Sequence, residues 1–258
     1  MLRQLMDLYQ FRELIQVLIA RDVKGRYRGT FLGFLWSLLN PLIFMIIYVI
    51  VFSIYLRIEM EDYPVFLLSG ILPWLWFSNS IMESTTSILG NGSLIKKVWL
   101  PLEIFPLVPI GSHMIHYLFS SVLLLGCILV FGRSLSWPLL AFPLVLAFQC
   151  LLSYGLALFV SALTVHFRDL FHLIPNLLLM VFFLTPILYP LSMVPEAYRD
   201  VIQINPLAIL VNAYQDIFFH NRFPTWGGFG FIGAWAACFL GGGLWIFRQR
   251  KEFFVEAL

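Results

Sequence analysis

The chain contains 258 residues, of which 60% are hydrophobic and only 12% are charged. Soluble domains carry about 25% charged residues, so this chain lacks the charged side chains that would cover a water-facing surface. The mean hydropathy of +0.89 agrees with this. The net charge of +2 comes from basic residues that form no stripe typical of nucleic-acid binding. Composition therefore predicts an integral membrane protein that does not bind nucleic acid.

The first 28 residues lack the continuous apolar core of a secretory signal and contain acidic residues, so we expect an uncleaved, cytoplasmic N-terminus. From residue 5 to residue 28 the apolar residues share one helical stripe, which Arg12 interrupts. The stripe consists of Leu8, Phe11, Ile15, Leu18 and Ile19. We predict that 1–28 form a cytoplasmic amphipathic interface helix and that 29–258 form a single transmembrane domain.

Charge-free stretches locate the membrane spans, because a helix needs about 20 mostly apolar residues to cross the hydrocarbon core. Long apolar runs, rather than short stretches of alternating polarity, favour helices over a β-barrel. The chain contains six such runs, and we expect the spans at 29–56, 63–82, 104–132, 138–165, 170–189 and 227–247. The predicted fold is therefore all-α with six transmembrane helices.

Lys and Arg residues in the connections indicate the orientation, because cytoplasmic loops carry an excess of them. With the N-terminus inside, twelve of the 16 Lys and Arg residues lie on the cytoplasmic side and four lie outside. The four external residues are Arg57, Arg133, Arg199 and Arg222. We therefore expect both termini in the cytoplasm.

The segment 191–224 joins the last two predicted spans on the external side and is too long for an unstructured loop. Its apolar pieces, 196–204 and 207–220, are too short to cross the membrane, and Asn205 and Pro206 separate them. We predict two short helices that re-enter the membrane from its outer face.

No motif in the chain supplies catalytic chemistry. The phosphate-binding pattern G-x-x-x-x-G-K-[ST] does not occur, so a separate polypeptide would bind ATP and Mg²⁺ if transport is ATP-driven. The spans hold neither a serine–histidine–aspartate set nor paired carboxylates, so no catalytic residue is predicted. The three cysteines lie in apolar runs without metal-ligand spacing, and we expect no metal and no cofactor in this chain.

His113 and His116 lie three residues apart near the inner end of the third predicted span, on one helical face. Ionisable groups inside membranes are often functional, which makes a metal site or a proton relay conceivable. Hydrogen bonding to a neighbouring helix is the simpler interpretation, because no Asp or Glu shares that span. The sequence leaves their role open.

A basic cluster precedes the first predicted span and consists of Arg21, Lys24, Arg26 and Arg28. Cations at this position commonly anchor the topology or hold anionic lipid. A second interpretation is a binding site for a phosphate-bearing substrate at the inner membrane surface, because arginine contacts phosphate bidentately.

The connection 83–103 carries apolar residues that a plain cytoplasmic loop would expose. Glycines end one helix and a proline limits the next, so we expect a short helix between them. Exposing these apolar residues is unfavourable unless the membrane or a partner protein covers them. The candidate contact residues are Leu94, Ile95, Lys96, Lys97 and Val98.

Short motifs follow one another along nearly the whole chain. They are Arg21-Asp22 with Arg26-Tyr27-Arg28, LGFLW at 32–36 with Asn40-Pro41, GILPWLW at 70–76, NGSLIKKVWLP at 91–101, and Phe167-Arg168-Asp169 followed by TPI at 185–187 and Asn205-Pro206. Together, and with six spans, they resemble the permease subunits of ABC transporters that export polysaccharides.

The resemblance implies a homodimer of six-helix subunits paired with two copies of a separate ABC nucleotide-binding subunit. Such permeases lie in the bacterial cytoplasmic membrane and export lipid-linked O-antigen, capsular polysaccharide or wall teichoic acid, typically on undecaprenyl pyrophosphate. In this family the N-terminal helix and the helix after the second span contact the ATPase, and two short external helices close the outer mouth. The segments 1–28, 83–103 and 191–224 are the counterparts here.

Amphipathic aromatic side chains suit the path of a sugar polymer, because their rings contact apolar sugar faces without demanding one hydroxyl pattern. Trp and Tyr also collect at membrane interfaces for reasons unrelated to transport, so both interpretations stand. The candidates are Trp36, Trp74, Trp76, Tyr189, Tyr198 and Tyr214. The basic cluster and these aromatics together are the predicted substrate-binding residues.

Other functions compete with polysaccharide export. An ABC permease for a drug or a small lipid would share the same architecture. An intramembrane transferase acting on lipid carriers would need a convergent catalytic carboxylate or histidine, which the spans lack. The sequence does not distinguish O-antigen, capsule and teichoic acid as the exported polymer.

Overall fold

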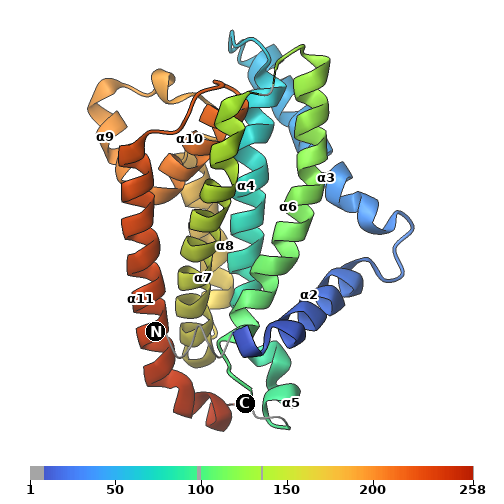
Figure 1. Ribbon diagram of the computed structural model, residues 1–258, viewed down its shortest axis with the longest axis vertical. Coiled ribbons are helices and arrows are strands. Elements are labelled where there is room, and N and C mark those ends of the chain that lie inside the picture. Colours follow the sequence, from blue (N-terminus) through green and yellow to red (C-terminus); the bar gives the residue numbers. More distant parts are fainter. Residues whose placement is uncertain (1–8, 98–99, 135, 258) are drawn as a thin grey trace.

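The protein forms a bundle of long helices that run side by side, with one further helix lying across one end (Figure 1). The computed structural model describes residues 9–97, 100–134 and 136–257, with side chains as far as Arg250. Within this part of the chain every regular element is a helix, and no strand occurs. The all-α prediction is therefore confirmed.

Five helical segments in the described part are long and apolar enough to cross a membrane. The first joins η1 (Gly33–Leu35), α3 (Trp36–Val49) and η2 (Ile50–Tyr55). The others are α4 (Tyr63–Ser84), α6 (Ile104–Val130), α7 (Phe142–His166) with η4 (Trp137–Ala141) before it, and α11 (Trp226–Ala257). They correspond to all the predicted spans except the fifth.

Helix α8 (Leu170–Leu184) occupies the place of the predicted fifth span but has only 15 residues. At 1.5 Å per residue it is about 22 Å long, which is less than the ~30 Å hydrocarbon core. The helix stops at Thr185 because Pro186 follows, and a residue before proline avoids the helical conformation. A sixth membrane crossing stays a prediction, because α8 would need residues 185–189 to reach across the hydrocarbon core.

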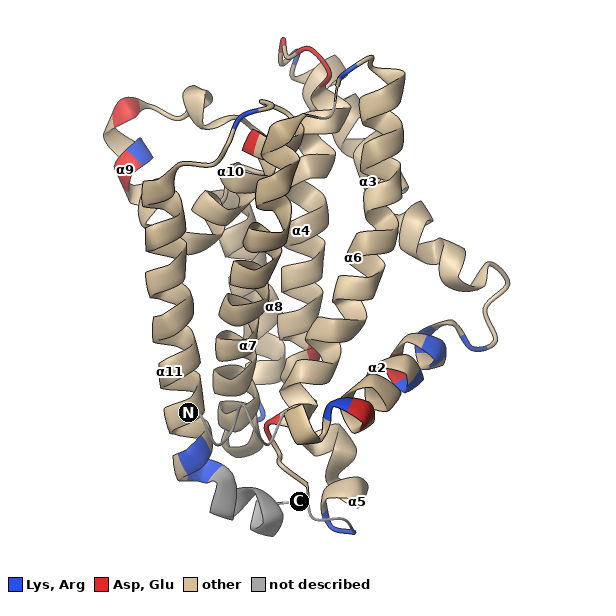
Figure 2. Ribbon diagram, in the orientation of Figure 1, with Lys and Arg blue, Asp and Glu red and all other residues tan. Residues whose placement is uncertain are grey.

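Charged residues gather at the two ends of the bundle and are nearly absent from its middle (Figure 2). One end carries α2 (Arg12–Tyr27), α5 (Gly92–Ile95) and the basic residues of α11; we call it the α2 end. The opposite end carries α9 (Glu196–Ile204), and we call it the α9 end. The four Arg residues that the sequence placed outside lie at the α9 end, so the described basic residues divide between the ends as predicted.

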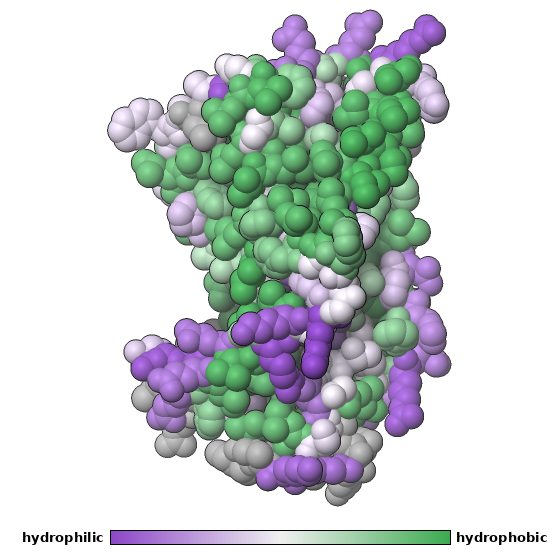
Figure 3. Space-filling model, turned by 90° about the vertical axis from the view of Figure 1, so that its right-hand side faces the viewer, coloured by the Kyte–Doolittle hydropathy of each residue, from purple (hydrophilic) through white to green (hydrophobic). Residues whose placement is uncertain are grey.

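A broad apolar surface lies above the hydrophilic side chains of α2 on the side of the molecule that α2 and α3 cover (Figure 3). The exposed large apolar residues of α3 are Trp36, Ile43, Phe44, Ile46 and Ile47. α4, by contrast, is the central helix, and 83% of its most apolar window is buried. The other helices therefore enclose α4, whereas the face of the bundle seen in Figure 3 is largely apolar above α2.

Two glycines bring the backbones of α7 and α11 into direct contact. A Cβ atom at Gly155 would lie 2.3 Å from the backbone nitrogen of Leu240, and one at Gly243 would lie 2.2 Å from the carbonyl oxygen of Gly155. Small residues at such crossings let membrane helices approach closely. This contact holds the last helix against α7.

The two short helices predicted after α8 are present, but they have different surroundings. α10 (Pro206–Phe218) packs against α4, α7 and α11, and most of its residues are buried. α9 contains no buried residue and contacts mainly α10. Asn205 separates the two helices and caps α10, because its Oδ1 accepts a hydrogen bond from the Leu207 N–H at 3.0 Å.

The helix predicted near the N-terminus is α2, and it packs along the α2 end of α6. Leu18 is buried, and Ile19 lies directly over Gly111, where a Cβ would be 2.4 Å from the Ile19 Cδ1. Leu8 of the predicted stripe lies outside the described residues. At least part of the apolar stripe therefore contacts protein, and its contact with a membrane surface stays a prediction.

Candidate functional site at the α2 end

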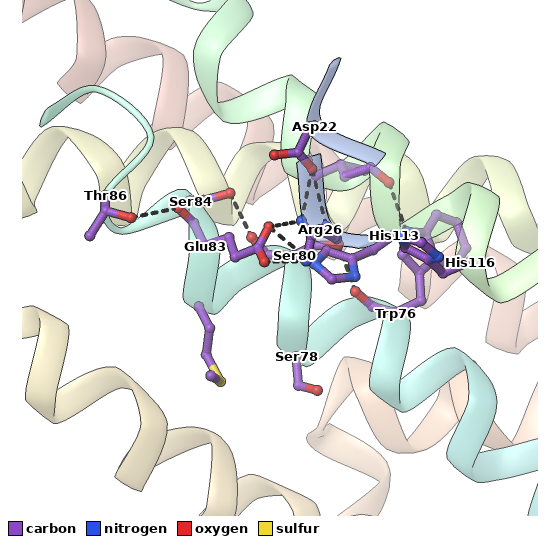
Figure 4. A network of polar contacts seen from close by, with 12 residues as sticks. Asp22, Arg26, Trp76, Ser78, Ser80, Glu83, Ser84, Thr86, His113 and His116 are labelled. Carbon is purple, nitrogen blue, oxygen red and sulfur yellow. Dashed lines mark hydrogen bonds and ion pairs between the residues drawn. The ribbon is translucent and has the colours of Figure 1, made fainter. Parts of the chain in front are cut away.

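A network of charged side chains joins α2 to α4 at the α2 end (Figure 4). Both terminal nitrogens of the Arg26 guanidinium donate to the carboxylate of Glu83, one to each oxygen. The same guanidinium donates to Asp22 Oδ2 at 2.8 Å, one helical turn earlier on α2. A bidentate arginine–carboxylate pair is both strong and directional, so α2 has a defined attachment to α4.

Two histidines extend the network to α6. His113 Nε2 lies 3.2 Å from Glu83 Oε2, and His116 Nδ1 lies 3.2 Å from the Tyr27 hydroxyl. The Tyr27 and Phe34 rings also lie against the His116 ring, with centroids 5.4 Å and 5.3 Å away. Both histidines thus lie against neighbouring helices, and the contact of His116 with Tyr27 is the kind of hydrogen bond that the simpler interpretation predicted.

The environment keeps Arg26 charged. Partial burial lowers the pKa of this guanidinium, but its hydrogen bonds to Glu83 and Asp22 outweigh burial, so the pKa is raised overall. The side chains of Arg26 and Glu83 are 23% and 38% exposed. The pair is therefore sheltered, yet a solute can reach it.

The four predicted phosphate-binding cations differ in what they contact. Arg26 is bound by two carboxylates, and Arg21 donates to Asn91 Oδ1 at 3.1 Å. Lys24 and Arg28 are exposed, and neither forms an ion pair within the described part of the chain. Lys24 and Arg28 therefore present free cations, whereas the charge of Arg26 is already neutralised.

Two cavities meet at the Arg26–Glu83 pair. One, of about 490 Å³, opens beside Arg21, Asp22 and Thr86. The other, of about 510 Å³, lies between α2, α3, α4 and α6 and is lined by both apolar and polar side chains of those helices. Its polar lining includes Ser37, Asn40, Asn79, His113, His116, Tyr117 and Ser120. Arg26 and Glu83 line both cavities, so this pair forms part of the wall between them.

The predicted coupling segment contains the expected short helix, α5, directly after η3 (Leu89–Asn91). Lys96 and Lys97 are exposed and Leu94 is half-buried, whereas Ile95 is buried in the hydrophobic core. Ile95 therefore does not form the exposed apolar surface that the sequence suggested, because it already packs into the hydrophobic core of the subunit. Val98 lies outside the described residues.

The predicted aromatic residues also divide by exposure. Trp36 and Tyr198 are 37% and 63% exposed, and Tyr189 is half-buried with its hydroxyl donating to the Phe183 carbonyl at 2.9 Å. Trp74, Trp76 and Tyr214 are buried. These three rings pack inside the subunit in this conformation, so they offer no surface to a passing polymer.

Hydrogen bonds explain why two of these rings are held inside. The Trp76 indole N–H donates to the Ile110 carbonyl at 3.1 Å, and the Tyr214 hydroxyl donates to Gln149 Oε1 at 2.6 Å. Sequence reasoning could not separate buried from exposed aromatics on a chain that is apolar throughout. It also missed Glu83 and Asp22, although a carboxylate at the end of an apolar span is itself a signal.

The fold and the site together define a multi-pass membrane protein with a charged, partly enclosed site at one end. The chain belongs to the ABC-2 type transporter family, whose model matches residues 13–219. It is 35% identical to the O-antigen export system permease protein RfbA of Myxococcus xanthus over the full length of both chains.

Two further relatives extend this comparison. RfbA of Klebsiella pneumoniae is 34% identical over 81% of each chain. The polysialic acid transport protein KpsM of Escherichia coli is 24% identical over 92% of this chain and 93% of its own length. The resemblance that the short motifs suggested is confirmed.

Proposed function

We propose that this chain is the membrane subunit of an ATP-driven exporter that moves a lipid-linked polysaccharide across the bacterial cytoplasmic membrane. The observation that carries the proposal is the full-length similarity to an O-antigen export permease. Polysialic acid transport by a more distant relative supports polysaccharide rather than a drug or a small lipid as the cargo. The proposed carrier is undecaprenyl pyrophosphate, in keeping with the free cations Lys24 and Arg28 on α2.

The proposed topology places the α2 end in the cytoplasm and the α9 end outside. The excess of Lys and Arg at the α2 end supports this orientation. In this arrangement α8 and 185–189 make the sixth crossing, while α9 and α10 re-enter from the outer face. Both termini then lie in the cytoplasm.

The ATPase is proposed to be a separate chain, present in two copies beside a permease homodimer. ABC-2 membership supports an ATPase partner, and the sequence contains no phosphate-binding loop of its own. The proposed contacts are α2 and the α5 segment, where Leu94, Lys96 and Lys97 remain accessible.

The proposed path lies where two subunits meet. α3 and α8 support this placement, because both expose large apolar side chains along much of their length. Trp36 lies at the α2 end of α3, and Tyr198 lies on α9, so these two remain candidates for contacts with the polymer. Trp74, Trp76 and Tyr214 are no longer proposed to contact the polymer, because they are buried inside the subunit.

Reconstitution with the partner ATPase tests the proposal. The permease is co-purified with its proposed partner ATPase and placed in vesicles with a lipid-linked O-polysaccharide. We expect ATP-dependent movement of the polysaccharide to the far side, measured by accessibility to an added glycosidase. Movement of a small lipid but not of the polysaccharide would overturn the assigned cargo.

A matched pair of variants tests the cations on α2. Arg28→Glu should reduce export severalfold because an exposed cation near the membrane is replaced by an anion that repels the carrier pyrophosphate. Arg12→Glu makes the same charge change at the far end of α2 and should have a smaller effect. Equal export by the two variants, with unchanged topology in reporter fusions, would favour simple lipid anchoring over substrate binding.

A further inference from the structure

The Arg26–Glu83 pair lies where an entering anion would have to compete with a carboxylate of the protein itself. Glu83 uses both its oxygens on the guanidinium, which is the geometry that a phosphate oxygen pair would also adopt. The free cations Lys24, on the same helix, and Arg28, directly after it, raise the local concentration of anions near this point. The bidentate site of Arg26 is thus occupied until something displaces Glu83.

The position of the pair gives that displacement a structural consequence. Arg26 and Glu83 line both the cavity beside Arg21 and the cavity between α2, α3, α4 and α6. Separation of the two side chains would remove part of the wall between these cavities and connect them. The second cavity has a mixed lining, and the amides, hydroxyls and imidazoles among its lining groups can bind a sugar or a phosphate.

Glu83 would not be left alone after separation. His113 Nε2 already lies 3.2 Å from Glu83 Oε2, so an imidazole nitrogen of α6 stays next to the carboxylate. Asp22 keeps Arg26 oriented from within α2. After an exchange of partners at Arg26, both Arg26 and Glu83 still have a polar neighbour. The exchange therefore avoids the large free-energy cost of leaving a partly buried charge without any contact.

We propose that Arg26 and Glu83 form a latch in which Glu83 occupies the phosphate site of Arg26 until the pyrophosphate of the lipid carrier replaces it. Replacement frees Glu83 to pair with His113 alone, connects the two cavities, and loosens the attachment of α2 to α4. The identity of the anion rests on the proposed function; the occupied arginine site rests on the network in Figure 4.

Binding measurements on the full-length permease test the latch. The probe is undecaprenyl pyrophosphate in phosphatidylcholine nanodiscs. Glu83→Gln removes the competing carboxylate, so we expect binding about tenfold tighter if the wild-type latch is open about a tenth of the time. Glu13→Gln makes the same change on an exposed part of α2 and should leave the affinity unchanged. Unchanged affinity in both variants would overturn the latch.

A charge swap separates a latch from a structural strut. Arg26→Glu combined with Glu83→Arg rebuilds the ion pair but places a carboxylate on α2 where phosphate would bind. We expect a folded protein, judged by its thermal unfolding midpoint, that binds the probe at least about tenfold more weakly because like charges repel. Restored wild-type binding in the swapped protein would show a strut and overturn the latch.

Two further arms identify the anion and separate this proposal from the proposed function. Inorganic pyrophosphate should compete with the probe, and phosphatidylglycerol in the nanodisc should not. Equal competition by phosphatidylglycerol would overturn the assignment of the carrier pyrophosphate as the ligand.

If Glu83→Gln proves unstable, Glu83→Asp keeps the charge, weakens the bidentate contact with Arg26 and should still tighten binding of the probe. If the wild-type protein exports the polysaccharide and the variants bind the probe and export the polysaccharide just as well, the latch is overturned while the proposed function stands.

Discussion

The two short helices α9 and α10 follow each other directly in the chain, yet they are held in opposite ways. α10 is bound into the subunit: Tyr214 contacts Gln149 of α7, and the Gln215 Nε2 donates to the Pro186 carbonyl at 3.0 Å. The Arg133 guanidinium donates to the Phe219 carbonyl at the end of α10 and lies 4.2 Å above the Phe219 ring.

The polar contacts of α9 are local instead. Arg199 donates to the carbonyls of Val194 and Ser192, which immediately precede the helix, and lies 3.8 Å from Glu196 within it. Tyr198, Val201 and Ile204 are all more than 60% exposed. The sequence predicted two short external helices without distinguishing them, whereas the structure buries most of α10 in the core and leaves α9 without a buried residue.

The largest expected contrast is between two tyrosines. Tyr214→Ala should destabilise the protein by about 3–5 kcal/mol, as removal of other large buried aromatic residues does, and it also removes the partner of Gln149. Tyr198→Ala on α9 should change stability by only about 0.5 kcal/mol. Thermal unfolding of the purified protein measures both. A similar loss in the two variants would contradict the difference between the helices.

A second contrast tests how closely α10 approaches α4. A Cβ at Gly70 of α4 would lie 3.0 Å from Gln215 Nε2 and 3.3 Å from Val211 Cγ1. Gly70→Val should therefore push α10 outward and cost about 1–3 kcal/mol. Gly230→Val, where no atom would contact the new Cβ, is the control for the effect of valine in a membrane helix. Unfolding midpoints that do not differ would show that α10 is not tightly held.

The smallest expected effect lies at the junction of the two helices. Asn205 caps α10 and also donates to the Thr185 hydroxyl at 3.1 Å. Asn205→Ala should cost about 1 kcal/mol, the usual loss for an N-cap, while Asn205→Asp keeps the capping oxygen and should lose less. Exchange of backbone amide hydrogens in the first turn of α10 reports the change. If the substitution speeds amide exchange only in α9, Asn205 does not stabilise the first turn of α10 and the prediction is wrong.

Much of the fold follows from the local pattern of the chain. Long charge-free runs predicted five of the membrane helices that the structure contains, because burying backbone polar groups in lipid requires helices. Asn205-Pro206 predicted the break between α9 and α10. The expected span 170–189 is shorter as a helix, since Thr185 before Pro186 leaves the helical conformation.

The candidate site was predictable only in part. The basic residues of α2 were identified as a cluster because they are close in sequence. The capture of Arg26 by Glu83 joins residues 57 positions apart, and no local pattern indicates which carboxylate meets which cation. The same holds for Trp76 and Tyr214, whose burial depends on how α4, α6, α7 and α10 pack.

The sequence by itself determined that this is a helical membrane protein, where its long helices lie, and how its charge divides between the two ends, because these depend on the composition of consecutive residues. Tertiary structure alone decided three features of the molecule. α10 is buried while α9 is exposed, Gly155 and Gly243 let α7 and α11 come into contact, and Glu83 forms an ion pair with Arg26. Each of these depends on distances between residues far apart in the chain, which are set only when the helices pack together.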